Sequence, residues 1–174
     1  MSTIIEHASA WVQTRTQGIF VIPASSGSGG AAKVGVDITP LNVIITPQKV
    51  GNKIELKFAV FGMSNSLSSA TAIGFILKRN GSNLPSTTDG SDNYYAVNAV
   101  PFASGETATT TPSVTMVTLT DNNSLDSATT YTLAVRLTHS NSSTRNFYLN
   151  RSASAPASSA ETGVSTTTIT EYDL

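Results

Sequence analysis

Residues 53–61 alternate between two faces, strictly polar and apolar as far as Phe58, and this pattern constrains the fold more than any other part of the sequence. The apolar members are Ile54, Leu56, Phe58 and Val60, and the polar members facing the other way are Lys53, Glu55 and Lys57. Because successive side chains of a β-strand point to opposite faces, a period of two indicates a strand with one buried face. The sequence therefore predicts a half-buried strand here, with the apolar set in the core.

The same kind of segment recurs along the chain. Residues 73–77 alternate and lead to Asn80-Gly81, a strong hairpin signal because both residue types accept positive φ. Residues 131–138 alternate in the same way, and further strands are expected at 41–46, 94–100, 114–120, 145–150 and 164–172. Short strands separated by turn residues predict an all-β protein, an antiparallel β-sandwich or jelly roll. No helix is predicted.

The composition agrees with this fold class. Serine and threonine make up 49 of the 174 residues, and valine and isoleucine dominate the aliphatic residues. β-branched side chains suit the pleated, half-buried surface of a sheet, whereas a helical bundle needs long periodic runs of leucine, alanine, glutamate and lysine. The length suits one domain of ordinary size.

Charge and residue content exclude several classes of function. The net charge is −1 and the 10 basic residues are not clustered, so no nucleic-acid partner is expected. The absence of cysteine excludes disulfides and thiolate sites, and two histidines cannot build a three-histidine zinc site. No apolar run approaches the roughly 20 residues of a membrane helix, so no membrane partner is expected. The N-terminal residues lack the pattern of a signal peptide, so synthesis in a cytoplasm is expected.

The first part of the chain has a different character from the rest. Residues 1–22 show no helical period and predict an extended arm with one or two short strands. Residues 24–32 are rich in glycine, serine and alanine, as is typical of a flexible linker. The chain is therefore divided into an N-terminal arm with its linker, 1–32, and a jelly-roll body, 33–174. The apolar residues expected to bind a partner from this arm are Trp11, Ile19, Phe20 and Ile22.

No motif predicts chemistry. Residues 89–93 form an oxygen-rich loop that could hold Ca²⁺, but they lack the spacing of a calcium-binding loop and read as a solvated turn. Residues 26–29 are not a nucleophile elbow, and the 11 acidic residues are scattered rather than paired around a sugar site. The sequence therefore predicts no enzyme, no catalytic residue, no metal site and no cofactor.

The expected outward faces of the strands carry threonine, serine and alanine rather than lysine and glutamate. Only 12% of the residues are charged, against the quarter or more that is usual on a monomer's surface. This deficit indicates an exterior that is largely buried against other copies of the chain. A weakly charged monomer is the competing interpretation.

Four blocks of sequence, in this order, carry a resemblance to a known family: residues 74–82, 125–132, 146–152 and 165–172. Over roughly residues 40–174 the chain resembles the trimeric jelly-roll module of tailed-bacteriophage virion proteins, which occurs at fibre tips and in other virion appendages, especially of marine phages. The resemblance implies a homotrimer of β-sandwich subunits, similar in outline to tumour-necrosis-factor-like and C1q-like trimers. It brings no catalytic residues with it.

These observations lead to one expected function and one alternative. We expect a virion protein, a homotrimeric capsid decoration (cement) protein that binds the major capsid protein or another virion protein through its arm. The alternative is the receptor-binding tip of a tail fibre, in which loops at 82–93 and 139–145 would contact a host surface glycan.

Overall fold

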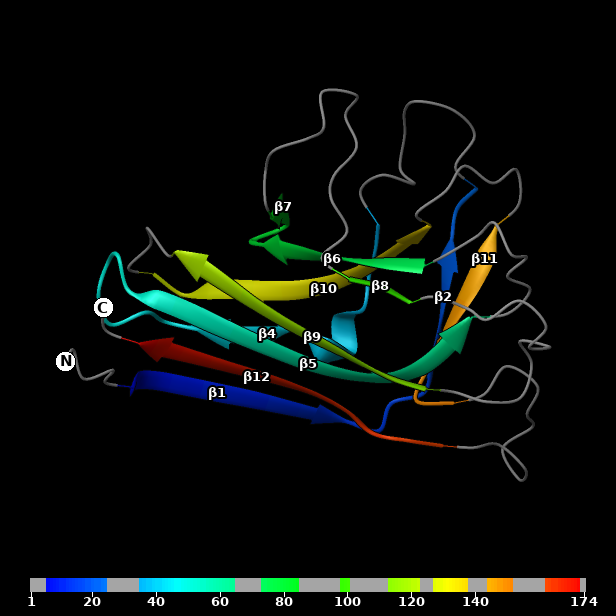
Figure 1. Ribbon diagram of the computed structural model, residues 1–174, viewed down its shortest axis with the longest axis horizontal. Helices are drawn as coiled ribbons and strands as arrows, with labels where there is room; N and C mark the ends of the chain where they lie inside the picture. The colour runs from blue at the N-terminus through cyan, green and yellow to red at the C-terminus, as the bar shows by residue number, and fades with distance from the viewer. Residues whose placement is uncertain are drawn as a thin grey trace.

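The computed structural model describes residues 6–24, 35–64, 73–84, 98–100, 113–122, 127–137, 144–151 and 162–172. They form two antiparallel β-sheets packed face to face (Figure 1), which confirms the expected all-β sandwich. The first sheet consists of β1 (Glu6–Thr14), β12 (Ser165–Tyr172), β5 (Lys53–Ser64), β11 (Arg145–Leu149), β2 (Gly18–Ile22) and β9 (Ser113–Asn122).

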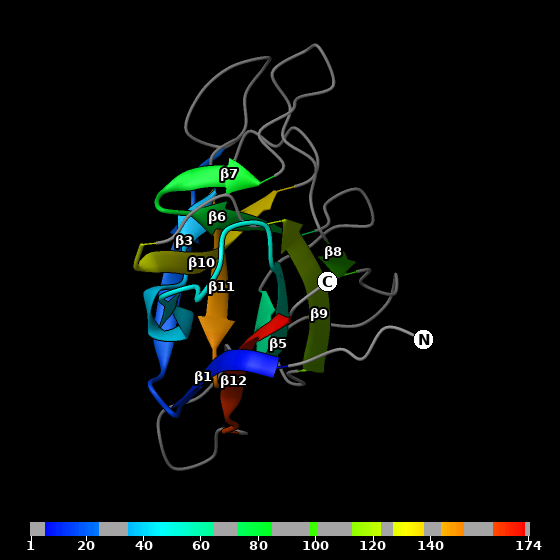
Figure 2. The same ribbon diagram turned by 90° about the vertical axis from the view of Figure 1, so that its left-hand side faces the viewer.

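The second sheet is built around two central strands, β10 (Thr129–Leu137) and β6 (Ile73–Arg79). Shorter strands flank them: β3 (Val36–Asp37), β4 (Val43–Ile45), β7 (Ser82–Leu84) and β8 (Asn98–Val100). A 3₁₀ helix, η2 (Thr39–Leu41), separates β3 from β4. Figure 2 shows the layers from the side, with β6, β7 and β10 on one side and β5 and β9 on the other. Among the residues that the structure describes, no helix has the length and hydropathy of a membrane span.

The strands pair from the two ends of the sequence inward. β1 pairs with β12, β2 with β11, β4 with β10, β5 with β9, and β6 with β8. Such nested antiparallel pairs are what a long hairpin gives when it rolls up into a sandwich, so the connectivity is that of a jelly roll. In Figure 1 this brings β1, drawn in blue, beside β12, drawn in red.

β5 is the central strand of the first sheet and follows the predicted register. Its four inward residues are fully buried, with exposed fractions of at most 1%: Ile54, Leu56, Phe58 and Val60. One edge of β5 pairs with β9 along its length, whereas the other edge pairs first with β12 and then, from Gly62, with β11. At this change a Cβ atom on Gly62 would lie 2.5 Å from the Tyr148 carbonyl oxygen, so glycine is required.

The hairpin predicted at Asn80-Gly81 is present. These two residues join β6 to β7, with Arg79 opposite Ser82, and both have positive φ, 49° and 81°. The turn is also tied to the neighbouring strand, because the Asn80 side-chain oxygen accepts a hydrogen bond of 2.9 Å from the Thr130 amide. The strand continuing after this turn, β7, is one that the sequence pattern did not predict.

The division between an arm and a body is wrong for the part of the arm that the structure describes. β1 forms the edge of the first sheet beside β12, and β2 pairs with β11 from Arg145 to Leu149. Both strands therefore belong to the sandwich, and Ile22 lies in its core with no exposed surface. The linker expected at 24–32 lies outside the described residues apart from Ala24.

The core fills the space between the two sheets. Phe75 of β6 meets Phe147 of β11 edge to face, with ring centroids 5.9 Å apart. The fully buried large side chains of this core come from both sheets, from η2 and from the residue before it: Tyr131, Phe58, Phe75, Ile22, Ile38, Leu41, Ile54, Leu56 and Leu133. Because these contacts join strands that are distant in sequence, the packing fixes which faces of the sheets are left for solvent or partners.

Candidate interaction surface

The outward face of the first sheet carries most of the exposed apolar groups. Within the described residues, seven large hydrophobic side chains are exposed, and five of them project from this face: Trp11, Ile19, Val21, Val114 and Met116. The other two lie elsewhere, Ile44 on β4 of the second sheet and Val50 in the turn before β5. This uneven distribution makes the outward face of the first sheet the candidate interaction surface.

The β9 part of this face forms an apolar patch, which we call the β9 patch. Val114 and Met116 are 57% and 59% exposed, and their register partners on β5 are Phe61 and Ala59. The Phe61 ring lies against the backbone at Gly163, where a Cβ atom would be 2.3 Å from it. The patch therefore rests on a rigid support formed by two strands and a glycine contact.

A second pair of exposed residues, the β2 pair, lies on the outward side of β2. Ile19 and Val21 are 52% and 56% exposed. Ile19 is opposite Tyr148 of β11, which is buried and carries the Arg151 guanidinium 5.8 Å from its ring centroid. The exposed β2 pair thus lies beside the buried Tyr148 of the neighbouring strand β11.

Trp11 lies on β1, among hydroxyl and amide side chains. It is 67% exposed and its register partner on β12 is Thr168. Its outward neighbours on β1 are Ser9 and Gln13, opposite Thr170 and Thr166. Trp11 therefore differs from the β9 patch and the β2 pair, because its outward neighbours are polar.

The four residues expected to bind a partner have different positions in the structure. Trp11 and Ile19 are exposed, and Phe20 is half-buried against the core, 6.5 Å from the Phe147 ring. Ile22 is fully buried, so its assignment as a partner-binding residue is wrong. The exposed neighbour is instead Val21, which the sequence analysis did not single out.

Among the described residues, the charged groups of this face are Lys53, Glu55 and Lys57 on β5 and Arg151 beside Tyr148. Lys57 and Glu55 form an ion pair of 2.7 Å, and the hydrogen bond to Glu55 raises the pKa of Lys57 above its ordinary value. The surrounding outward positions are largely threonines: Thr118, Thr120, Thr166, Thr168 and Thr170. Away from these charged groups, the face presents hydroxyl and apolar groups.

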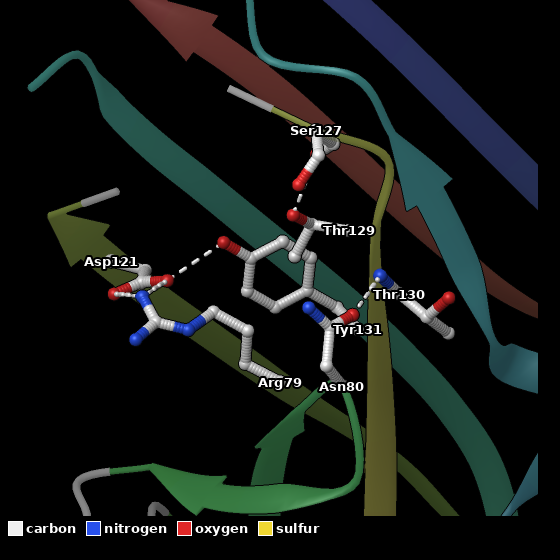
Figure 3. A network of polar contacts seen from close by, with 7 residues as sticks. All are labelled: Arg79, Asn80, Asp121, Ser127, Thr129, Thr130 and Tyr131. Atoms are coloured by element: carbon white, nitrogen blue, oxygen red, sulfur yellow. Dashed lines mark hydrogen bonds and ion pairs between the residues drawn. The ribbon is translucent and has the colours of Figure 1, made fainter. Parts of the chain in front are cut away.

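A network of polar side chains connects the two sheets (Figure 3). Tyr131 of β10 donates a hydrogen bond of 2.7 Å to Asp121 of β9, and Arg79 of β6 donates to both oxygens of the same carboxylate, at 3.2 and 2.9 Å. Burial, with the hydrogen bond to Asp121 second, raises the pKa of Tyr131. The network has the form of a structural cross-link, because the Asp121 carboxylate binds both the Tyr131 hydroxyl and the Arg79 guanidinium.

Glu171 of β12 holds the turn between the sheets from inside. Its carboxylate is buried and accepts hydrogen bonds from the Gln48 amide at 2.8 Å and from Asn52 Nδ2 at 2.7 Å. The Lys49 amide donates to it at 3.2 Å. The carboxylate is thus used by the backbone of the turn, which fixes the position of the exposed Val50.

Several residues considered in the sequence cannot be placed. The oxygen-rich loop 89–93, the segment 26–29, most of the loop 82–93 and most of the loop 139–145 lie outside the described residues. In the part of the chain that is described, no three histidine or acidic side chains cluster as a metal site would require. Comparison with known proteins adds no relative, since no family model matches the sequence and no curated protein aligns with it significantly.

Proposed function

We propose that this chain is a structural subunit of a bacteriophage virion: a homotrimeric decoration (cement) protein of the capsid. The observation that supports this most is the outward face of the first sheet, on which five exposed apolar side chains stand among threonines. Reinforcing a capsid needs complementary buried area in many copies, and it needs no catalytic group. The virion context rests on the sequence resemblance, whose blocks overlap with β6, β10, β11 and β12.

The β9 patch is the part of the face best suited to self-association. Val114 and Met116 project from a ten-residue strand, and none of the residues from Ser113 to Thr120 is charged. Identical groups of the three copies approach each other near the threefold axis of a trimer, and a neutral strand placed there avoids repulsion between like charges. We therefore place the contact between copies at this patch.

The β2 pair is the contact that we assign to the particle. Ile19 retains its expected role, and Val21 takes the place of the buried Ile22. These side chains project from a short strand that is fixed to β11 along its whole length. Attachment is then made by a rigid surface of the sandwich and not by a detached arm.

The trimer is tested by light scattering at micromolar concentration. The expected mass is about three times the chain mass of 18.1 kDa. Met116→Glu should give a folded monomer, since it places an unpaired charge in the contact. Ile44→Glu is the matched control, because Ile44 is also 59% exposed but lies on the other sheet, and it should remain trimeric. A monomeric wild-type protein would contradict the proposal.

Attachment is tested on virions stripped of the protein. Val21→Glu should lower the occupancy of re-bound protein, whereas Val50→Glu, at a similarly exposed position off the face, should not. Density in a whole-virion map on the capsid surface would support the decoration role. Density at the end of a tail fibre would favour the alternative, a receptor-binding tip.

A further inference from the structure

Trp11 is the most exposed large hydrophobic side chain in the described residues, at 67%, and its surroundings are polar. We define the Trp11 platform as the outward residues that flank it on β1 and lie opposite on β12: Ser9, Trp11, Gln13, Thr166, Thr168 and Thr170. Apart from the indole, every member carries a hydroxyl or an amide group. The nearest exposed apolar groups of the face belong to the β9 patch and the β2 pair, on other strands.

The platform is held in a fixed geometry. β1 pairs with β12 without interruption from Ala8 to Thr14, and β12 is paired on its other side with β5. The inward residues on either side of Trp11, Ala10 and Val12, pack against the core. The indole is therefore kept on the outside, and a ligand would not have to order it first.

The surroundings of the indole determine what kind of ligand fits. An apolar protein surface placed here would cover the hydroxyl and amide groups without giving them hydrogen bonds, which costs free energy. A pyranose ring has an apolar C–H face that stacks on an indole, and a rim of hydroxyls that can exchange hydrogen bonds with threonine, serine and glutamine. Both parts of such a ligand find a counterpart on the platform.

Charge narrows the class of ligand further. Lys57 is the neighbour of Thr168 on β5, and its ammonium group is paired with Glu55 at 2.7 Å. No platform residue is charged, and the charged residues opposite Thr168 and Thr170, Lys57 and Glu55, are paired with each other. We propose that the Trp11 platform binds a neutral oligosaccharide, with a sugar ring stacked on the Trp11 indole.

This inference is independent of the proposed trimer and of the virion role. The residues that it uses differ from those of the β9 patch and the β2 pair, so each proposal can fail alone. A folded monomer that binds sugar, or a trimer that does not, would separate the two.

Trp11 itself reports on the binding, because it is the only tryptophan in the chain. The full-length protein is titrated with neutral hexaoses of glucose, mannose and galactose, and the emission of Trp11 is followed together with the heat of binding. We expect a saturable change in emission with at least one of these sugars. An oligogalacturonate of equal length, which is acidic, should bind more weakly than its neutral counterpart.

Variants connect the signal to the site. By calorimetry, Trp11→Ala should weaken binding about tenfold or more, and Trp11→Phe should retain part of the affinity. Ile44→Ala, at an exposed position on the other sheet, should bind as the wild type does. The proposal is overturned if no neutral hexaose saturates at millimolar concentration, or if Trp11→Ala binds equally well. An emission spectrum that shifts with protein concentration alone would also overturn it, because a second copy would then cover Trp11.

Discussion

Ser165 Oγ donates a hydrogen bond of 2.6 Å to Asn150 Oδ1, and both residues are fully buried where β5 changes its partner from β12 to β11. The same hydroxyl accepts from the Phe61 amide at 2.9 Å. Asn150, with a positive φ of 58°, donates through Nδ2 to the carbonyls of Thr14 and Thr16, both at 3.0 Å. One buried pair therefore joins β5 to the connection between β1 and β2.

Removing the hydroxyl of this pair should destabilise the whole sandwich. Ser165→Ala leaves the Phe61 amide and Asn150 Oδ1 without their partner, and unsatisfied buried groups cost about 1–3 kcal/mol of unfolding free energy. Urea unfolding measures the change. Thr168→Ala, at an exposed position of the same strand, is the control and should stay within about 0.5 kcal/mol of the wild type. If Ser165→Ala and Thr168→Ala changed the unfolding free energy equally, the buried network around Ser165 would contribute little to stability.

Two adjacent residues of β2 test whether this segment belongs to the sandwich. Ile22→Ala should cost about 2–5 kcal/mol because the side chain is fully buried, whereas Val21→Ala, 56% exposed, should cost about 0.5 kcal/mol or less. Deleting residues 1–24 should abolish cooperative thermal unfolding, since the edges of β11 and β12 lose their partners. A truncated chain that still unfolds cooperatively would contradict the pairing of β1 with β12 and of β2 with β11.

The register of β5 is tested in the same way on its two faces. Phe58→Ala should cost about 3–5 kcal/mol, because the ring has no exposed surface and its loss leaves a cavity. Lys57→Ala removes only an exposed ion pair with Glu55 and should cost less than about 1 kcal/mol. Chemical denaturation of both variants gives the comparison, and equally mild effects would contradict the register.

Tyr131 predicts how stability depends on alkaline pH. Burial and then the hydrogen bond to Asp121 raise the pKa of Tyr131 above the ordinary value of 10.0. Above pH 10 the unfolded chain loses the Tyr131 hydroxyl proton while the folded chain keeps it. The stabilisation that this proton gives the folded state is therefore fully present below pH 10 and is lost as the pH rises. In urea unfolding, the decline above pH 10 should be shallower in Tyr131→Phe than in wild type, by up to about 1.4 kcal/mol per pH unit. If the unfolding free energies of the two proteins fell in parallel, folding would not raise the pKa of Tyr131.

The parts of the fold that the sequence predicted are those with local signals. The register of β5 follows from its own alternation, and the turn between β6 and β7 follows from Asn80-Gly81. β3 and β7 were missed because two or three residues are too few to show a period. The membership of β1 in the first sheet depends on β12, whose sequence lies far away, so no local pattern could reveal it.

The candidate surface could be predicted only in part, for a related reason. Residues 19–22 are apolar at every position, so a period of two could not distinguish the exposed Val21 from the buried Ile22. Residues 114–119 likewise place apolar side chains on both faces, and only the packing shows that Met116 faces outward while Val117 is buried. Trp11 was recognisable from the sequence because it is the only tryptophan in the chain.

The pairing of β1 with β12 has a consequence for how the protein is made. β1 leaves the ribosome long before β12 has been synthesised. Its apolar residues Val12 and Trp11 therefore remain unpaired in the nascent chain until β12 is complete. Docking can occur only when translation has delivered the final strand of the sandwich, and such pairing of distant segments is slow to find. Until then, the exposed edge of β1 is open to unintended partners, and nascent chains on neighbouring ribosomes of one message are the nearest of these.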